Sequence, residues 1–265
     1  MRFLITGDTH RIFSRFHSIK PVENEQTAVI ILGDAGLNIG RERDDRDTKN
    51  ALCRNYPYLF YCVRGNHELR PEDVPGMELI WDDYVGGHVW VENSFPNIRY
   101  FQDWGIYHIN GLRTLVIGGA YSVDKWWRLQ RGSFWSSREQ LTTEEMEECE
   151  RFVTKRPHFD LVLSHTTATR YQPTDLFLGC IDQTTVDNTM EKWLEHLFEK
   201  ITFGIHLFGH YHADRIEAPY VEQFFNEIED LNAIVNRWYQ YSQTEQLDWW
   251  LPRSPKMDRI EQQRG

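Results

Sequence analysis

The chain has 265 residues, of which 40 % are apolar and 14 % aromatic, and its formal net charge is −11. This composition suffices to bury a core in one large domain or two small ones. No stretch approaches the roughly 20 uninterrupted apolar residues of a membrane span, and the negative charge argues against the basic surface that duplex nucleic acid requires. The apolar part of the start, MRFLITGDTH, is too short for a signal peptide, so we expect a cytoplasmic location.

Five segments share one pattern, in which an apolar, β-branched or aromatic run ends in glycine or serine and is then followed by a residue type that binds metals. In chain order they are RFLITGDTH, AVIILGD, LFYCVRGNHE, DLVLSH and IHLFGHYH. Short continuous apolar runs bounded by turn residues are typical of strands that are buried on both faces. The pattern therefore predicts five buried strands that each lead into a polar loop.

Candidate helices lie between these strands at residues 44–56, 142–155 and 184–200. All three carry acidic residues in or near the first turn, and the last two open on a threonine suited to N-capping. Strands that alternate with helices predict an α/β core.

Residues 81–135 break this alternation, since they hold six of the ten tryptophans. Within them, GIYHINGLRTLVIGG places two β-type runs on either side of Asn110-Gly111, a strong hairpin signal. We therefore expect an antiparallel hairpin excursion from the core. Further along, helical spacing predicts a helix over 221–238, although residues 222–231 also fit a strand.

Residues that follow the carboxyl ends of strands converge in space in open α/β sheets. The five strand endings supply Asp8, His10, Asp34, Asn66, His67, His165, His210 and His212. Histidine nitrogens with carboxylate and amide oxygens suit Mn²⁺, Fe or Zn²⁺ better than Ca²⁺, while Mg²⁺ prefers oxygen alone. This is a set of seven ligands with one residue to spare. Seven ligands are too many for one tetrahedral ion, but they suit two ions. If the chain stays extended past Gly209, His210 and His212 share one face.

The ordered motifs GDTH, GD, GNHE, SH and GHYH, which span residues 7 to 212, resemble those of calcineurin-like metallophosphoesterases, especially small bacterial and phage-type members. The resemblance implies a four-layer α/β/β/α sandwich over residues 1–220. Residues 221–265 are then a C-terminal extension that packs on this core, with a mobile tail from about residue 252. It also implies one ion held by Asp8, His10 and His212, another held by Asn66, His165 and His210, and Asp34 as the bridge between them.

Two ions roughly 3.5 to 4 Å apart can neutralise phosphoester oxygens and convert a shared water into a bridging hydroxide nucleophile. The leaving group still needs a proton, and the resemblance assigns this general-acid role to His67. Other branches of the family carry an aspartate three residues after the bridging one, where it orients this histidine, but here that position is Leu37. The acidic side chains considered as replacements are Glu68, Asp44 and Asp45.

Arginine is the natural phosphate contact, because its planar fork matches phosphate oxygens. Several arginines follow the first two motifs or lie in GGAYSVDKWWRLQRGSFW, and each is weighed against an ordinary solvated arginine. The arginine candidates are Arg11, Arg15, Arg41, Arg128 and Arg131. Because GGAYSVD resembles a segment of phage-type relatives, the pocket candidates are Tyr121, Ser122 and Asp124. Three nearby tryptophans either stack on a base or aromatic leaving group or simply pack: Trp126, Trp127 and Trp135.

The resemblance thus implies a binuclear metal-dependent phosphoester hydrolase. We expect a phosphatase with Mn²⁺, with Fe, Zn²⁺ and Mg²⁺ as alternatives, acting on a small-molecule phosphoester, a nucleotide or a phosphoprotein. A phosphodiesterase acting on nucleotides, cyclic nucleotides or nucleic acid is the second hypothesis. A scaffold that binds protein partners through an inactive metal site is the third. Neither a membrane nor duplex nucleic acid is an expected partner.

Overall fold

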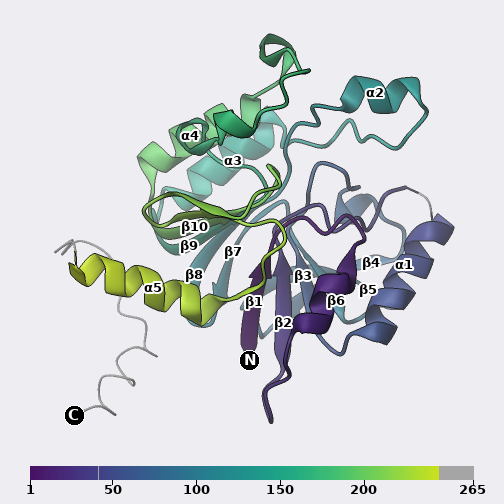
Figure 1. Ribbon diagram of the computed structural model, residues 1–265, viewed down its shortest axis with the longest axis vertical. Helices are drawn as coiled ribbons and strands as arrows, with labels where there is room; N and C mark the ends of the chain where they lie inside the picture. The colour runs from purple at the N-terminus through teal and green to yellow at the C-terminus, as the bar shows by residue number, and fades with distance from the viewer. Residues whose placement is uncertain (41, 245–265) are drawn as a thin grey trace.

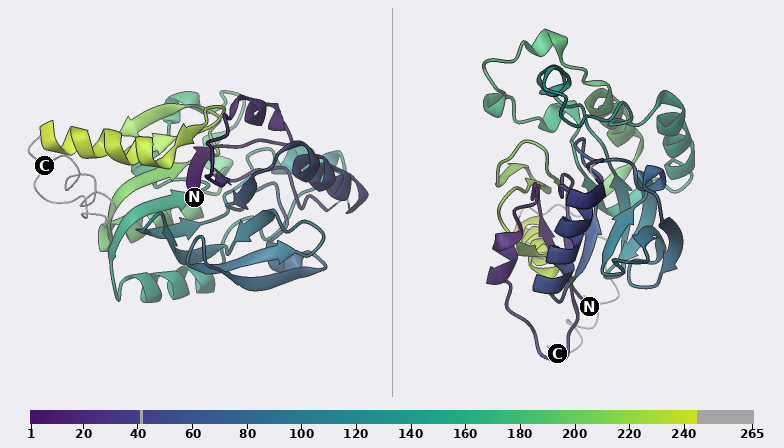
Figure 2. Two further views of the ribbon diagram at one scale, coloured as in Figure 1. Left: turned by 90° about the horizontal axis from the view of Figure 1, so that it is seen from below. Right: turned by 90° about the vertical axis from the view of Figure 1, so that its right-hand side faces the viewer.

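The computed structural model describes residues 1–40 and 42–244. Two β-sheets pack face to face, and helices cover their outer faces (Figures 1 and 2). This is the four-layer α/β/β/α sandwich predicted from the sequence. All five predicted buried strands are present, and each ends next to its metal-binding motif.

The first sheet has seven strands in the order β13-β1-β2-β3-β6-β5-β4. Its centre, from β1 to β6, is parallel, and antiparallel strands flank it on both sides. The strands are β1 (Arg2–Thr6), β2 (Thr27–Ile31), β3 (Leu59–Cys62), β4 (Met77–Asp82), β5 (Gly87–Glu92), β6 (Ile98–Phe101) and β13 (Glu229–Asp230).

The second sheet has six strands in the order β11-β12-β10-β9-β8-β7. Of these strands, only β12, β10, β9 and β8 are parallel, because β11 pairs with β12 in the antiparallel direction. The predicted hairpin forms its β7–β8 edge, where Asn110 (φ 54°) and Gly111 (φ 81°) adopt the positive φ values of a type I′ turn. The strands are β7 (Trp104–Ile109), β8 (Leu112–Ile117), β9 (His158–Ser164), β10 (Thr202–Phe208), β11 (Arg215–Ala218) and β12 (Val221–Gln223).

Apolar side chains fill three layers, one between the sheets and one on the outer face of each sheet. Helix α1 covers the first sheet, whereas α3 and α4 cover the second (Figure 1). Helix α2 projects away from both sheets at the top of the molecule (Figure 1). The helices are α1 (Glu42–Asn55), α2 (Lys125–Gln130), α3 (Thr143–Val153), α4 (Thr189–Lys200) and α5 (Leu231–Thr244). The 3₁₀ helices are η1 (Phe13–Ser18), η2 (Pro71–Asp73), η3 (Thr169–Tyr171), η4 (Thr174–Leu176) and η5 (Gln183–Thr185).

The predicted threonine cap is correct for α3 and wrong for α4. Thr142 and Glu145 form a reciprocal capping box at the start of α3. Helix α4 begins five residues later than predicted, because the carboxylates of Asp182 and Asp187 bind backbone N–H groups and fold residues 182–188 into separate turns.

The predicted helix over 221–238 is wrong in its first half. Residues 221–230 form β12 and β13, which add to one sheet each, and α5 starts only at Leu231. Leu231, Ile234 and Trp238 of α5 enter the layer between the sheets. The tail predicted to be mobile lies outside the described residues. None of the helices within the described part of the chain is long and apolar enough to span a membrane.

Candidate metal centre

The predicted ligands gather at one edge of the molecule, because β1, β2, β3, β9 and β10 all present their carboxyl ends there. The ligand atoms of Asp8, His10 and His212 lie within 4.8 Å of one another, as do those of Asp8, Asp34 and His165. Asp8 belongs to both groups. The structure thus brings together residues that are up to 204 positions apart, between 8 and 212, in the sequence.

In the first group, two imidazole nitrogens face each other over a carboxylate. His10 Nε2 lies 3.0 Å from His212 Nε2, and Asp8 Oδ2 lies 3.2 Å from His212 Nε2 and 3.8 Å from His10 Nε2. Asp8 Oδ2 is buried and accepts no well-aligned hydrogen bond. Burying a carboxylate oxygen without a hydrogen-bond donor costs free energy. A divalent cation between these three side chains would offset this cost.

In the second group, two lone pairs point at each other. His165 Nδ1 lies 2.9 Å from the Leu32 carbonyl oxygen, which can only accept, so Nδ1 carries the proton and Nε2 is a bare acceptor. Asn66 Nδ2 donates to Ser122 Oγ at 2.8 Å, which turns Asn66 Oδ1 toward His165 Nε2, also at 2.8 Å. A cation shared by these two acceptors would satisfy both lone pairs, so these residues fit a metal ion.

His210 lies beside this second group, with its ring centroid 4.9 Å from that of His165. Burial first, and then the neighbouring His165, lowers the pKa of His210 to about 3, which keeps the imidazole neutral and able to bind a metal. The extended geometry that would place His210 and His212 on one strand face does not continue past Gly209. Strand β10 ends at Phe208, and both histidines have positive φ (71° and 55°), so the loop directs each toward a different group.

Positive φ recurs among the ligands, since His10 (φ 44°) and Asp34 (φ 42°) adopt it too. A positive φ costs conformational free energy in residues other than glycine, and residues with such backbone strain cluster at functional sites. Glycine is required next to two ligands. A Cβ on Gly33 (φ 100°) would lie 1.9 Å from His165 Nδ1, and one on Gly65 would lie 1.9 Å from Asp34 Oδ1.

The two buried carboxylates remain ionised. Burial alone would raise the pKa of Asp34, but the neighbouring His67, His165 and His10 lower it well below its usual range. The pKa of Asp8 is likewise lowered, because His212 and His165 outweigh its burial. Two carboxylates held in the charged form suit divalent cations.

His67 lies at the mouth of the site, with Nε2 3.6 Å from Asp34 Oδ2 and 3.2 Å from Arg128 Nη2. Its backbone N–H donates to Asp34 Oδ1 at 3.0 Å. Burial lowers the pKa of His67, and Arg128 lowers it further against the opposing charge of Asp34. The side chain that faces this imidazole is therefore an arginine from a distant segment.

The acidic side chains considered as replacements for the missing aspartate lie elsewhere in the structure. Glu68 is buried and accepts the backbone N–H groups of Gly36 and Gly65, both at 3.0 Å, so it braces the two ligand loops. Asp45 accepts the backbone N–H of Asn38 at 2.6 Å. Asp44 lies exposed on α1, and Leu37 itself is fully buried in the core.

The substrate candidates fall into two sets. Arg128 reaches His67, and Ser122 holds Asn66, so both belong to the site. Arg15 instead donates to the backbone carbonyls of Phe225 and Asp8. Arg11 donates Nε to the Gly36 carbonyl at 2.7 Å and leaves a buried Nη2 without a partner. Tyr121 is only partly exposed and contacts Lys125 through its ring, whereas Arg41 lies outside the described residues.

The model of the calcineurin-like phosphoesterase family matches residues 1–214. The chain belongs to the calcineurin-like phosphoesterase family. This metallophosphoesterase is thus a phosphoric ester hydrolase. Among solved structures, a phosphopantetheinyl hydrolase from Mycobacterium tuberculosis is similar, with 14 % identity and a TM-score of 0.43 over 96 % of this chain and 93 % of that chain. No curated protein matches the chain.

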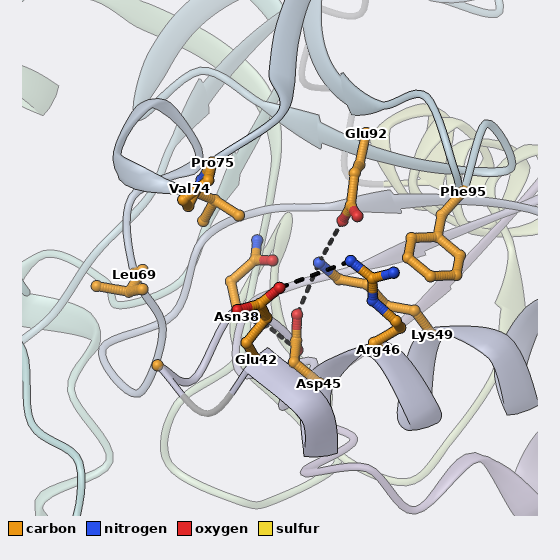
Figure 3. A pocket seen from close by; sticks show the side chains of 11 residues that line it. Asn38, Glu42, Asp45, Arg46, Lys49, Leu69, Val74, Pro75, Glu92 and Phe95 are labelled. Carbon is orange, nitrogen blue, oxygen red and sulfur yellow. Dashed lines mark hydrogen bonds and ion pairs between the residues drawn. The ribbon is translucent and has the colours of Figure 1, made fainter.

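A cavity of about 300 Å³ lies beside α1 in this metallophosphoesterase (Figure 3). Its floor holds Lys49, whose buried ammonium pairs with Asp45 at 2.7 Å and Glu92 at 2.8 Å. None of the residues that line it is a metal ligand of either group. We read this cluster as an ion pair that fastens α1 to β5.

The sequence did not reveal the Leu32 carbonyl as a support of the site, and it suggested Glu68 only as a replacement for the missing aspartate. The Leu32 carbonyl fixes the tautomer of His165, and Glu68 ties the loops after β2 and β3 together. A backbone carbonyl has no sequence signal. Glu68 did carry one, because it follows the ligand-bearing GNH directly, yet its burial became visible only in the fold.

Proposed function

We propose that this chain hydrolyses phosphoesters with two divalent ions and acts first as a phosphatase, with Mn²⁺ as the metal. The observation that carries the proposal is the pair of facing acceptors, His165 Nε2 and Asn66 Oδ1, at 2.8 Å. A divalent cation between them would satisfy both. The unpartnered Asp8 Oδ2 supports a second cation in the neighbouring group.

Seven side chains would hold the two ions. One ion would take Asp8, His10 and His212, the other would take Asn66, His165 and His210, and Asp34 would serve both. When bound, the two ions would neutralise phosphoryl oxygens and lower the pKa of a water molecule that attacks phosphorus.

The chain's own residues then do the rest. Arg128 would contact the phosphate oxygens, because its guanidinium lies at the mouth of the site and Asp124 holds it through a 2.7 Å ion pair. A phosphate that draws Arg128 toward itself would leave His67 Nε2 free to take up a proton from solvent, and the imidazolium would then give that proton to the leaving oxygen. Monoesters carry two negative charges, so this additional cation favours a phosphatase.

The experiment compares p-nitrophenyl phosphate with bis(p-nitrophenyl) phosphate in Mn²⁺, using wild type, Asp34→Asn and His67→Asn. We expect Asp34→Asn to lose bound metal and activity together. His67→Asn should keep its metal and lose rate mainly on esters with poorer leaving groups. Equal activity of the three proteins, or no metal uptake by wild type in elemental analysis, would refute the proposal.

Phosphodiester hydrolysis remains the alternative, and a higher kcat/KM for the diester would select it. The inactive scaffold fits less well. Its mark would be a missing ligand or a missing acid, whereas this sequence carries all seven candidate ligands and the candidate acid His67.

A further inference from the structure

Helix α2 exposes large aromatic side chains beside the metal centre. Trp127 is 51 % exposed and Trp126 63 % exposed, although tryptophan normally buries most of its surface. The helix buries no residue in the core, and in Figure 1 it projects from the body of the molecule. Packing therefore does not explain these two tryptophans.

Two hydrogen-bond contacts connect this projecting segment to the metal centre. Before the helix, Ser122 Oγ accepts the hydrogen bond from Asn66 Nδ2, and within it Arg128 Nη2 lies 3.2 Å from His67 Nε2. The face of α2 that carries Arg128 is thus the face that meets a substrate at the metal centre.

Helical geometry separates the two tryptophans. Each residue turns the helix by about 100°, so Trp127 flanks the Arg128 face, whereas Trp126, at about 200°, points away from it. Arg131, three residues after Arg128, shares its face and lies over the Trp127 ring at 4.4 Å. Trp127 and Arg131 therefore form one aromatic and cationic unit beside Arg128.

This surface is locally basic although the chain carries a net charge of −11. Asp124 pairs with Arg128, but Lys125 and Arg131 form no ion pair within 4 Å among the described residues. A cation pair interleaved with exposed aromatic rings is the chemistry that binds a phosphate next to an unpaired base.

We propose that α2 recognises the nucleoside part of the substrate, so that the phosphoesters hydrolysed are nucleotides or short single-stranded oligonucleotides. A base stacks on the open face of Trp127, and Arg131 contacts the neighbouring phosphate. This inference rests on the proposed function for the reaction itself, but recognition by α2 can be measured without turnover. Either a mononucleotide or an oligonucleotide could supply the base and the phosphate. The two are distinguished by whether the affinity of the protein rises with the number of nucleotides in the ligand.

The test measures the fluorescence anisotropy of 5′-fluorescein-labelled thymidylates of one, two, four and eight nucleotides with the full chain. Measurements in EDTA prevent cleavage and are repeated with Mn²⁺. An abasic eight-mer keeps the phosphates and removes the bases. Variants are Trp127→Ala and Arg131→Ala, and Trp126→Ala is the matched control, because it removes another exposed tryptophan from the opposite side of the same helix.

We expect Trp127→Ala to weaken thymidylate binding by about 5- to 150-fold, which is the usual range for one stacked base. Trp126→Ala should change it less than twofold. Arg131→Ala should weaken binding and flatten its salt dependence. If the affinity does not rise beyond one nucleotide, the ligand is a mononucleotide. If the affinity continues to rise with the number of nucleotides, the ligand is an oligonucleotide.

Three results overturn the inference: no thymidylate binding at all, equal affinity for the abasic strand, or equal losses in Trp126→Ala and Trp127→Ala. Loss of phosphoester hydrolysis in wild type would instead overturn only the proposed function, since binding in EDTA needs no metal.

Discussion

Arg128 Nη2 lies 3.2 Å from His67 Nε2, although the two residues are 61 positions apart in the chain. The contact places a cation beside this imidazole. Asp124 holds Arg128 in this place through an ion pair of 2.7 Å with its Nε.

Asp124→Asn should therefore raise the KM for a phosphomonoester, because it loosens the guanidinium without removing it. We expect a rise of several fold, with kcat falling less than in Arg128→Ala. Steady-state kinetics in Mn²⁺ measure both constants. Asp175→Asn, which breaks the exposed pair with Arg215, is the control and should leave both constants unchanged. A KM that stays constant in Asp124→Asn would contradict the role of Arg128.

Ser122→Ala should weaken one metal site and spare the other. The substitution removes the acceptor that turns the Asn66 amide, so Asn66 Oδ1 no longer has a fixed direction. Loss of such a supporting hydrogen bond costs about 10- to 100-fold in metal affinity. Titration calorimetry with Mn²⁺ should show two unequal binding steps in place of the wild-type pair. Ser242→Ala, which loses only a bond within α5, should bind as wild type does.

Gly65→Ala should abolish the metal centre through sterics alone. A Cβ here would lie 1.9 Å from Asp34 Oδ1 and 2.2 Å from its backbone nitrogen. Because both atoms belong to a fully buried residue, the loop has to move. We expect at least a 100-fold loss of activity, together with loss of bound metal by elemental analysis. Gly179→Ala, where no atom lies within 4 Å of the new Cβ, is the control. Normal metal content in Gly65→Ala would show that the loop is more adaptable than this geometry indicates.

His206 should make folding stability depend on pH. It is fully buried beneath α4, where Nε2 lies 2.7 Å from Ser164 Oγ, and burial lowers its pKa to about 3 from the ordinary 6.5. Between these values the unfolded chain binds the additional proton, so stability rises with pH and is lost as pH falls through this window. The full slope is about 1.4 kcal/mol per pH unit, or roughly 2 kcal/mol between pH 6.5 and 5.

A buried acid opposes this slope in part, so the wild-type curve alone is not diagnostic. Burial raises the pKa of Glu191 to about 7, and between 4.5 and 7 the folded chain then binds the additional proton, which lowers stability as pH rises. The comparison is therefore between wild type and His206→Asn in urea unfolding at pH 5 and pH 7. We expect the variant to lose less stability than wild type on acidification. Parallel curves would mean that His206 is not neutral in the fold.

Much of the site was predictable because its pattern is local. Each ligand follows an apolar run within a few residues, and the carboxyl ends of parallel strands meet at one edge whatever lies between them. The helix starts were less predictable. Asp187 competes for backbone N–H groups just before α4, and this choice between turn and helix depends on side-chain geometry that periodicity does not encode.

The sequence by itself determined the fold class and the candidate metal-binding residues, because periodicity and residue chemistry are properties of short segments. Only the tertiary structure decided that His210 and His212 leave the extended conformation, and that Arg128 reaches His67. Contacts of this kind join segments far apart in the chain, and their geometry exists only after the two sheets have packed.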